Sequence, residues 1–346
     1  MSPEVSVVIK SYNHVQFVAE AIESILNQSF QDFEIIITDD ASTDGTPEII
    51  KKYKDDRIKS IFHSKNQGIS MAMNATVSRA TGRYIAILNS DDYALPHRLE
   101  KQVEFLNSHP DYSLVFGLPL IVDESGHPTS GFNDFQRPLS FRNFQSSTWL
   151  NSFFFKGNCL AAPTAMIRKI AYESAGIYNP RLANLQDFDM WVRMLILDHN
   201  IFFMPEQLSA FRILNDFKNM SAPRTDTLLR STFELIQILC RYRDIPLDRL
   251  LRIFEPDCSN LPAGILEKSG ILLSYFGLAT RDTPRVFFAL QTLFDCADSE
   301  DEIRDLRSIL GGVDVFNVMS LRKSQETVRL LQEQLKGFGV NRDSPF

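Results

Sequence analysis

The sequence lacks several features that mark common classes of protein. Acidic side chains outnumber basic ones by 43 to 36, and the net charge of −7 argues against a general nucleic-acid-binding surface. The longest nearly uncharged apolar run, residues 113–122, is far shorter than the roughly 18 residues that a membrane span needs. The four cysteines form no CxxC pair and no metal-like spacing, so neither a disulfide framework nor a zinc site is predicted.

The N-terminal residues carry no leader pattern. Residues 1–4 are polar and acidic in character and lead straight into a predicted strand. Together with cysteines typical of reduced thiols, this predicts a cytoplasmic protein. Peripheral attachment to the cytosolic face of the inner membrane is an alternative that stays open.

Glycine-rich phosphate loops are also missing. No GxGxxG or GxxxxGK(S/T) pattern occurs, and the first strand-to-helix turn, residues 10–14, contains no glycine. This argues against a dinucleotide site and against a sugar nucleotidyltransferase, which should carry a glycine-rich basic loop. A metal ion held by carboxylates is the better counter-charge for a bound diphosphate.

What is present is an alternation of strand and helix patterns over the first 95 residues. The predicted strands are residues 5–9, 33–38, 58–62 and 85–88. The first helix is predicted to begin after an Asn13 N-cap, and residues 47–54 and 69–79 form the next two. Short connections between alternating elements predict an α/β fold with a mostly parallel sheet flanked by helices.

The pattern changes beyond residue 222 to one helix after another. The predicted helices are residues 226–243, 246–254, 263–276, 284–296, 300–310 and 318–336. This predicts an all-α C-terminal extension over residues 223–346. Leucine and valine spaced seven apart in the last helix leave two interpretations open, a short coiled coil and a linker helix. Homo-oligomerisation through these helices is a further alternative.

Acidic pairs follow two of the predicted strands. Asp39 and Asp40 come after the second strand, and Asp91 and Asp92 come after the fourth. The carboxyl ends of parallel strands meet at one crevice, so the two pairs should face each other. Adjacent carboxylates repel, which favours a divalent cation or a polyhydroxylated ligand. A solvated loop with an Asp N-cap is the alternative.

The motifs in their order resemble a family 2 glycosyltransferase with the GT-A, Rossmann-like nucleotide-sugar fold. The resemblance covers residues 4 to about 215. Its pieces are the first strand with Tyr12 and Asn13, the block 34–46, the loop 66–68, residues 82–85, the acidic motif 89–92, and residues 185–193. The resemblance implies a nucleotide-sugar-binding half, residues 1–95, and an acceptor-binding half, residues 96–222.

The resemblance assigns roles on the donor side. Tyr12 would wall the nucleobase, and Asp40 would accept the pyrimidine N3–H, while Asn66 and Gly68 belong to the donor loop. Asp91 would hold the ribose and the metal, and Asp92 would ligate Mn²⁺ or Mg²⁺ at the diphosphate. For Tyr12 an ordinary half-buried ring is the alternative. For Asp39 it is an anchor for the turn before Ser42.

On the acceptor side, Asp187 matches the catalytic base and Gln186 replaces the usual glutamate. Trp191 lies four residues after Asp187 on one helical face and should pack behind the carboxylate. A helix-terminal carboxylate favoured by the dipole is the alternative for Asp187. Arg212 would approach the substrate or be an edge-strand charge.

Three departures from the family pattern stand out. Asn89 occupies the place of the first acidic residue, and Met73 occupies the place of an arginine that could contact the diphosphate. Lys10, Lys65 and Arg79 are the candidates to replace that arginine, with solvated surface charges as the alternative. No histidine occurs in residues 211–221, where the family carries one near the metal.

The resemblance implies an inverting transfer from a nucleotide-sugar, first UDP-hexose or UDP-N-acetylhexosamine, to a hydroxyl of a glycan or lipid-linked acceptor. Bacterial surface polysaccharide synthesis is the expected setting. A transferase for dTDP-rhamnose and a catalytically inactive glycan-binding relative are the competing functions.

Overall fold

The computed structural model describes residues 2–129, 144–215, 219, 224–259, 261, 263–280 and 282–296. The chain divides into two compact units, Met1–Glu234 and Leu235–Phe346. The predicted helices 300–310 and 318–336, with the leucine spacing of the latter, lie outside the described residues.

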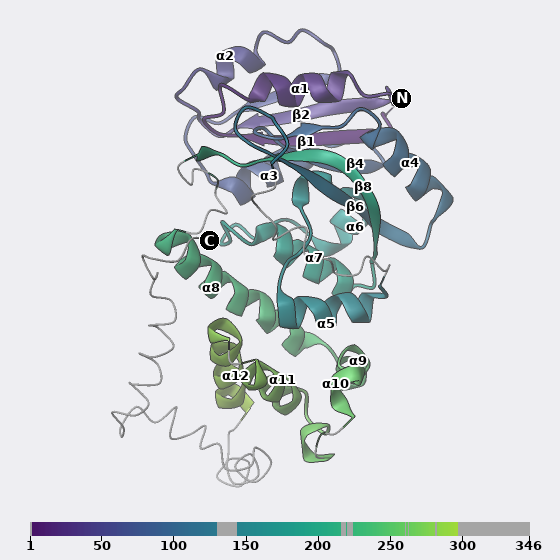
Figure 1. Cartoon of the computed structure of the whole chain (residues 1–346), viewed down its shortest axis with the longest axis vertical. Helices are drawn as coiled ribbons and strands as arrows, with labels where there is room; N and C mark the ends of the chain where they lie inside the picture. The colour runs from purple at the N-terminus through teal and green to yellow at the C-terminus, as the bar shows by residue number, and fades with distance from the viewer. Residues whose placement is uncertain are drawn as a thin grey trace. The chain divides into compact units, whose positions relative to one another are not determined.

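An eight-stranded sheet forms the centre of the first unit, with strand order β3-β2-β1-β4-β7-β6-β8-β5 (Figure 1). Strands β1 to β4 are parallel, β6 and β8 are parallel to each other, and β7 and β5 pair antiparallel with their neighbours. The bounds are β1 Val5–Ser11, β2 Phe33–Asp39, β3 Ile58–Phe62, β4 Tyr84–Asn89, β5 Tyr93–Ala94, β6 Tyr112–Val122, β7 Met166–Arg168 and β8 Asn200–Arg212. The predicted α/β fold with a mostly parallel sheet is confirmed.

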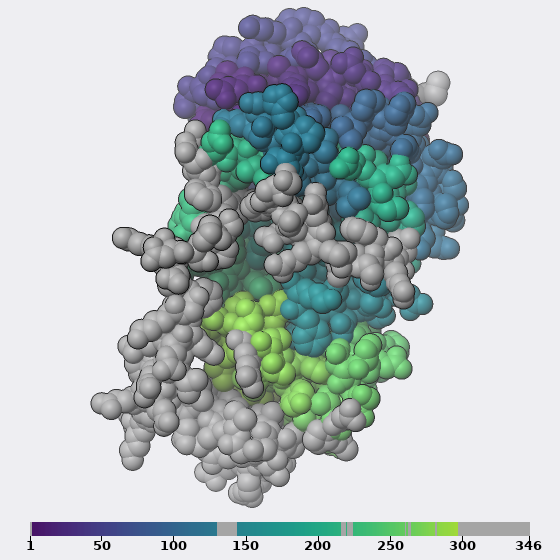
Figure 2. Space-filling view, in the orientation of Figure 1, coloured from purple at the N-terminus to yellow at the C-terminus, as the bar shows by residue number. Residues whose placement is uncertain are grey.

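Helices cover both faces of the parallel strands. Successive side chains of a strand point to opposite faces, and those of β1 and β2 are buried on both, so each face needs a covering layer. Val7 and Ile9 of β1 join a buried core with Ile22 of α1 and Leu99 of α4. On the other face, α3 donates a hydrogen bond from Thr76 Oγ1 to Thr38 Oγ1, 2.8 Å. The helices of this unit are α1 Val18–Leu26, α2 Thr46–Ile50, α3 Ile69–Val77, α4 Arg98–Ser108, α5 Ser146–Lys156, α6 Lys169–Ala175 and α7 Gln186–Ile196. Figure 2 shows the purple and blue N-terminal residues packed side by side on one face.

The predicted Asn13 N-cap is wrong. The first helix begins at Val18, and Asn13 adopts a left-handed conformation with φ 53°. Its side-chain oxygen accepts a hydrogen bond from the Thr43 backbone N–H at 2.8 Å. The amide therefore supports the loop after β2 and is not available to the helix terminus.

The second unit is helical throughout its described residues, as predicted for the C-terminal extension. Helix α8, Thr225–Leu239, begins in the first unit, and α9 Leu247–Ile253, α10 Glu255–Cys258, α11 Ser269–Ala279 and α12 Thr283–Cys296 follow. Leu272, Phe276 and Phe288 pack in its interior. None of the helices traced in either unit is long and apolar enough to span a bilayer.

Candidate active site

The acidic loop after β4 carries the first group of candidate residues. The buried strand ends at Asn89, and Asp92 is 2% exposed three residues later. Asp92 Oδ2 accepts a hydrogen bond from Asn89 Nδ2 at 2.7 Å, and Oδ1 accepts one from the Arg212 backbone N–H at 2.8 Å. The Asp91 carboxylate is more exposed, and His14 Nε2 lies 4.0 Å from its Oδ2. Both predicted metal ligands therefore belong to one loop.

The electrostatics of this loop favour a cation. Burial, and then the charge of the neighbouring Asp91, raise the pKa of Asp92 well above its usual range. Hydrogen bonds from Asn89 and Arg212 act in the opposite direction. A positive charge at the pair would relieve both the burial cost and the repulsion.

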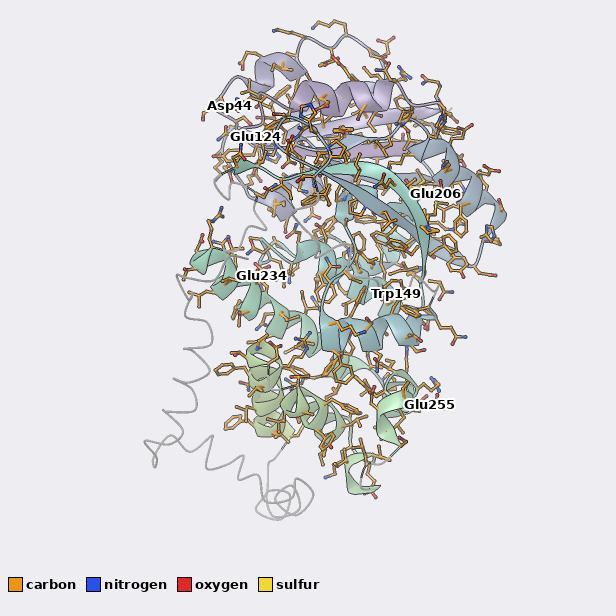
Figure 3. The ribbon with its side chains drawn as sticks, in the orientation of Figure 1. Asp44, Glu124, Trp149, Glu206, Glu234 and Glu255 are labelled. Atoms are coloured by element: carbon orange, nitrogen blue, oxygen red, sulfur yellow. The ribbon has the colours of Figure 1, made fainter. Side chains whose placement is uncertain are left out.

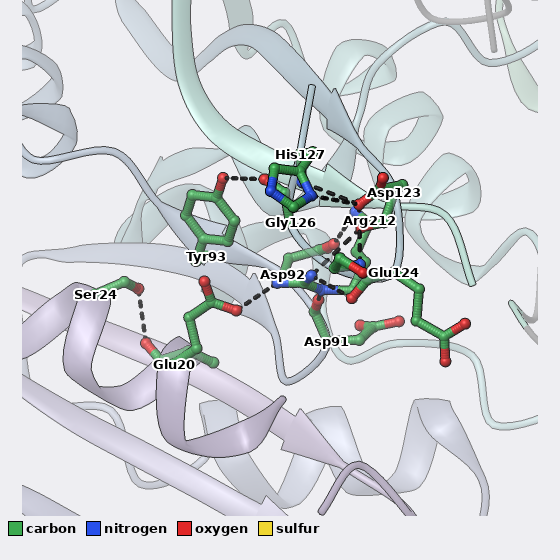
Figure 4. A network of polar contacts seen from close by, with 12 residues as sticks. Glu20, Ser24, Asp91, Asp92, Tyr93, Asp123, Glu124, Gly126, His127 and Arg212 are labelled. Atoms are coloured by element: carbon green, nitrogen blue, oxygen red, sulfur yellow. Dashed lines mark hydrogen bonds and ion pairs between the residues drawn. The ribbon is translucent and has the colours of Figure 1, made fainter. Parts of the chain in front are cut away.

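Arg212 lies buried at the acidic loop. Its side chain is 2% exposed, so it is no solvated edge charge, and its approach to a substrate stays a prediction. Its Nε donates to the Asp91 carbonyl at 2.8 Å, and Nη1 donates to the Glu124 carbonyl at 2.8 Å. Nη2 pairs with the Glu20 carboxylate (Figure 4). Arg212 therefore holds the acidic loop in place.

The loop after β2 brings the predicted donor residues together. Asp40 is 3% exposed and accepts hydrogen bonds from the backbone N–H groups of Gln67 and Gly68 at 2.9 and 2.8 Å. Gly68 sits at φ 88°, a conformation that favours glycine. Asp40 is thus joined to the predicted loop 66–68.

His63 is a neighbour of Asp40 that the sequence reasoning missed. Its Nδ1 lies 2.7 Å from Asp40 Oδ1. The sequence position of His63 could have indicated this contact. Asp39 pairs with Phe62 in the adjacent parallel strands β2 and β3, so the next residues, Asp40 and His63, lie opposite each other. The interpretation of Asp39 as a turn anchor is confirmed, because it accepts hydrogen bonds from the Ser42 N–H and hydroxyl.

Tyr12 follows β1 at the same sheet edge. Its side chain is 46% exposed. The Asp40 N–H donates to the Ser11 carbonyl at 2.9 Å, so the chain positions of Tyr12 and Asp40 adjoin across β1 and β2. The sheet therefore presents an exposed aromatic ring beside the Asp40 loop.

The candidate base lies in the first turn of α7. Asp187 Oδ2 accepts a hydrogen bond from Gln186 Nε2 at 3.2 Å. Burial raises the pKa of Asp187, and the nearby positive charge of Lys10 acts against that rise. Trp191 is fully buried and packs edge-to-face on Phe116 with ring centroids 5.1 Å apart. The indole thus anchors α7 to β6.

Buried polar atoms without a well-formed hydrogen bond cluster around this carboxylate. Among the described residues, they include Asp187 Oδ1, Gln186 Oε1, Trp191 Nε1 and the hydroxyls of Tyr172 and Tyr178. Such groups are rare in folded proteins and each calls for an explanation, of which a catalytic role is one. Asp187 Oδ1 is thus buried without a well-formed hydrogen bond, and the nearby Tyr178 hydroxyl acts to lower the pKa of this carboxylate.

Lys10 connects the two acidic centres. It pairs with Asn89 in the register of β1 and β4, and its Nζ donates to Asn89 Oδ1 at 2.6 Å. Its charge lowers the pKa of Asp92 and of Asp187. Lys65 and Arg79, the other two candidates for a replacement cation, have exposed side chains. Lys10 is therefore the candidate that the fold brings to the site.

Solved structures share this fold. The structure of S. aureus TarS residues 1–349 in complex with UDP-GlcNAc aligns with a TM-score of 0.57 at 18% identity, covering 89% of this chain and 91% of that one. The mannosyltransferase PcManGT from Pyrobaculum calidifontis, in complex with GDP-Man and Mn²⁺, aligns with a TM-score of 0.55 at 17% identity. That alignment covers 98% of this chain and 88% of PcManGT.

Curated relatives are closer in sequence. The glycosyltransferase named EpsE in Bacillus subtilis is 33% identical over 77% of this chain and 92% of its own length. TuaG of the same organism, named as a teichuronic acid biosynthesis glycosyltransferase, is 32% identical over 62% of this chain and 81% of its own length. An uncharacterized glycosyltransferase of Methanocaldococcus jannaschii is 36% identical over 62% of this chain and 72% of its own length.

The family model described as "Glycosyl transferase family 2" matches residues 6–170, which include both acidic pairs and Lys10. Helix α7 follows that match in the chain and carries Asp187. The chain belongs to the family 2 glycosyltransferases, the nucleotide-sugar-dependent enzymes with the GT-A fold.

Proposed function

We propose that this enzyme transfers a sugar from a UDP-sugar to a hydroxyl of a glycan or lipid-linked acceptor, with inversion at the anomeric carbon. The observation that carries the proposal is a pair of acidic centres whose pKa values are both affected by the charge of Lys10. One centre is formed by Asp91 and Asp92, and the other is Asp187. TarS was solved with UDP-GlcNAc, and TuaG is named for teichuronic acid biosynthesis, which supports this donor and a surface-polysaccharide acceptor. The reaction would run in the cytoplasm or at the cytosolic membrane face.

The donor's base would lie between Tyr12 and the Asp40 loop. Three donors make four hydrogen bonds to Asp40, because the Gln67 N–H is shared between Oδ1 at 2.9 Å and Oδ2 at 3.1 Å. The N3–H of uracil would therefore bond to Oδ2 in place of the longer branch of this shared bond. Cytosine has no hydrogen at N3 and could not make this contact. Asn66 and Gly68 close the same loop beneath the base.

Asp91 and Asp92 fit Mn²⁺ or Mg²⁺, because hard carboxylate oxygens in a repelling pair suit these ions. No cluster of three or more His, Cys, Asp or Glu side chains occurs in the part of the chain that the structure describes, so phosphate oxygens and water would complete the shell. When bound, such an ion neutralises charge on the departing nucleoside diphosphate. PcManGT holds Mn²⁺ with its donor, which supports this assignment.

Lys10 would bind the diphosphate. Its ammonium is partly exposed, and its hydrogen-bond partner Asn89 is neutral. An ammonium beside a neutral amide retains charge for a phosphate oxygen, and charge-assisted hydrogen bonds of this kind are the stronger ones. Lys10 would thus do the work of the arginine that Met73 replaces.

Asp187 would act as the general base. Its carboxylate takes the proton from the acceptor hydroxyl while the oxygen forms a bond to the anomeric carbon. The bond from that carbon to the diphosphate breaks, and the nucleoside diphosphate leaves with the electron pair from the opposite face. Gln186 steadies the carboxylate through its amide, and Trp191 fixes α7 against the sheet.

Two other functions make different predictions. A dTDP-rhamnose transferase would use the same Asp40 contact, because thymine also carries a hydrogen at N3. An inactive glycan-binding relative would bind sugars without consuming any nucleotide-sugar.

Calorimetric titration with UDP, dTDP, GDP and CDP, each with Mn²⁺ and with EDTA, tests the proposal. We expect manganese-dependent binding of UDP that is lost in Asp92→Ala and kept in Asp56→Ala, which changes an exposed aspartate in the turn before β3. Tighter binding of dTDP would favour the rhamnose donor. Binding of none of the four nucleotides would contradict the proposed donor site.

A further inference from the structure

The segment between α6 and α7, residues 176–185, delivers Asp187 to the site and is held by side chains from distant elements. Asn74 of α3 forms two hydrogen bonds with the backbone of Tyr178. Its Nδ2 donates to the Tyr178 carbonyl at 2.9 Å, and its Oδ1 accepts from the Tyr178 N–H at 2.8 Å. Ser70 Oγ donates to the Leu182 carbonyl at 2.6 Å.

A single carboxylate holds the last part of this segment. Glu234 lies on α8, where Figure 3 labels it. Its side chain is buried, with 1% exposed. Its Oε1 accepts a hydrogen bond from the Ala183 N–H at 2.7 Å. Its Oε2 accepts from the N–H groups of Asn184 and Leu185 at 2.9 and 2.7 Å. Three consecutive backbone N–H groups thus meet one buried side chain.

These three N–H groups directly precede α7. The N-terminus of a helix leaves N–H groups unpaired and carries partial positive charge, so an anion there is favoured. Within α7 no side chain caps the helix, and its N-cap residue is Leu185. Of the three bound N–H groups, only that of the N-cap residue Leu185 belongs to the start of α7, and Glu234 binds it from another helix as the N3 glutamate of a capping box would do locally.

The loop has two further bonds to α8. Asn184 Nδ2 donates to the Thr227 carbonyl at 3.2 Å and to Ser231 Oγ at 3.1 Å. These are longer than the bonds to Glu234, and Ser231 lies one helical turn before it. One face of α8 therefore binds residues 183–185, and the Glu234 carboxylate makes the shortest of its hydrogen bonds.

We propose that Glu234 is a positioning residue for the catalytic base. The proposal rests on the proposed function, in which Asp187 is that base. Asp187 lies two residues after Leu185, so the orientation of the held N–H groups sets the direction in which the first turn of α7 presents its carboxylate. A base displaced by about 1 Å can lose on the order of 100-fold in rate.

Glu234→Gln tests this. The glutamine amide keeps the length of the side chain, but one acceptor oxygen becomes a donor that faces a backbone N–H. We expect kcat to fall roughly 10-fold to 100-fold, while KM for the donor stays within about threefold. Amide hydrogen exchange at residues 183–185 should accelerate, a readout that does not require turnover.

The matched control is Glu206→Gln, which removes an exposed carboxylate of β8 that pairs with Lys101. It should change neither kcat nor exchange at residues 183–185. If Glu234→Gln does not fold, Glu234→Asp decides, because it keeps the charge but shortens the side chain by one methylene, so that the carboxylate cannot reach all three N–H groups at their present positions. We then expect a kcat roughly 10-fold lower with KM for the donor unchanged, and faster amide exchange at residues 183–185.

A kcat within twofold of wild type in folded Glu234→Gln, or in Glu234→Asp where that variant decides, would overturn the proposal. Equal loss of kcat and of UDP binding would overturn it too, because the side chain would then support the whole fold. Turnover by the wild-type enzyme is measured first. Its absence would count against the proposed function, whereas an active wild type with an unaffected Glu234→Gln counts against the positioning role alone.

Discussion

The two acidic centres of the site are held in different ways. Asp92 has a hydrogen-bond donor on each carboxylate oxygen, from Asn89 and from the Arg212 backbone. Asp187 has one well-formed hydrogen bond, at 3.2 Å, and a looser contact with the Tyr178 hydroxyl that acts to lower its pKa, while its buried Oδ1 has no well-formed hydrogen bond among the described residues. A carboxylate with a donor on each oxygen suits a binding role, and a more loosely held carboxylate suits proton transfer. The difference divides the work between the two centres.

Their supports differ as well. The Asp92 loop is clamped directly by the guanidinium of Arg212, which crosses from β8. Asp187 is positioned through the backbone that precedes it, by Glu234 and Asn74. Asp92, the proposed metal ligand, therefore depends on Arg212 and Asn89, while Asp187, the proposed base, depends on the conformation of a loop.

The largest effect should come from Asp187→Asn. The amide cannot accept the acceptor's proton, so transfer should fall by about 100-fold to 10,000-fold, the usual contribution of a general base. UDP binding should stay within about twofold, because Asp187 does not hold the donor. Steady-state rates and calorimetry on the same sample measure both quantities. Normal turnover would mean that the base lies elsewhere.

Lys10→Met should affect both acidic centres, because the charge of Lys10 acts on the pKa of Asp92 and of Asp187. Loss of a charge-assisted hydrogen bond to the diphosphate should weaken UDP binding roughly 10-fold to 100-fold and leave uridine binding unchanged. Lys10→Arg should retain most of the affinity. Lys65→Met, at an exposed lysine, is the matched control.

The same variant predicts a shift in pH dependence. Lys10 lowers the pKa of Asp187, so its removal should raise that pKa. The base works when deprotonated, and the acidic limb of kcat/KM should therefore move to higher pH in Lys10→Met. An unmoved limb would show that the charge of Lys10 does not reach the base.

Arg212→Lys should have the smallest effect of the three on catalysis and should act mainly on stability. Lysine cannot replace the fork that binds the Asp91 and Glu124 carbonyls, and unpaired buried acceptors cost about 1–3 kcal/mol. Urea unfolding measures this loss. Glu20→Gln is the comparison, with a loss below about 1 kcal/mol, because Glu20 is half exposed. Equal losses would mean that the ion pair, and not the carbonyl contacts, is what stabilises the loop.

Local patterns in the sequence predicted the parts of the site that lie next to each other. The parallel sheet followed from alternating elements, and the resemblance placed Asp40 and residues 66–68 together on the donor side, where the structure joins them by hydrogen bonds. The Asn13 cap was wrong because a side chain after β2 competes for the same amide. The burial of Arg212 could not be predicted, because it depends on how β8 crosses the acidic loop.

The supports of the base could not be predicted from local patterns. Asn74 and Tyr178 are 104 residues apart, and Glu234 is 49 to 51 residues from the N–H groups it binds. No periodicity or motif relates such positions, because their contact depends on the packing of α3 and α8 around the segment before α7. The order of motifs identified Asp187, and the fold identified what holds it.

The stereochemistry of the product tests the central claim most directly. A single displacement assisted by Asp187 converts an α-linked nucleotide-sugar into a β-linked product. Proton NMR of the first product formed from an α-linked UDP-sugar should show only the β-anomer. An α-linked product would contradict the single displacement and the role given to Asp187.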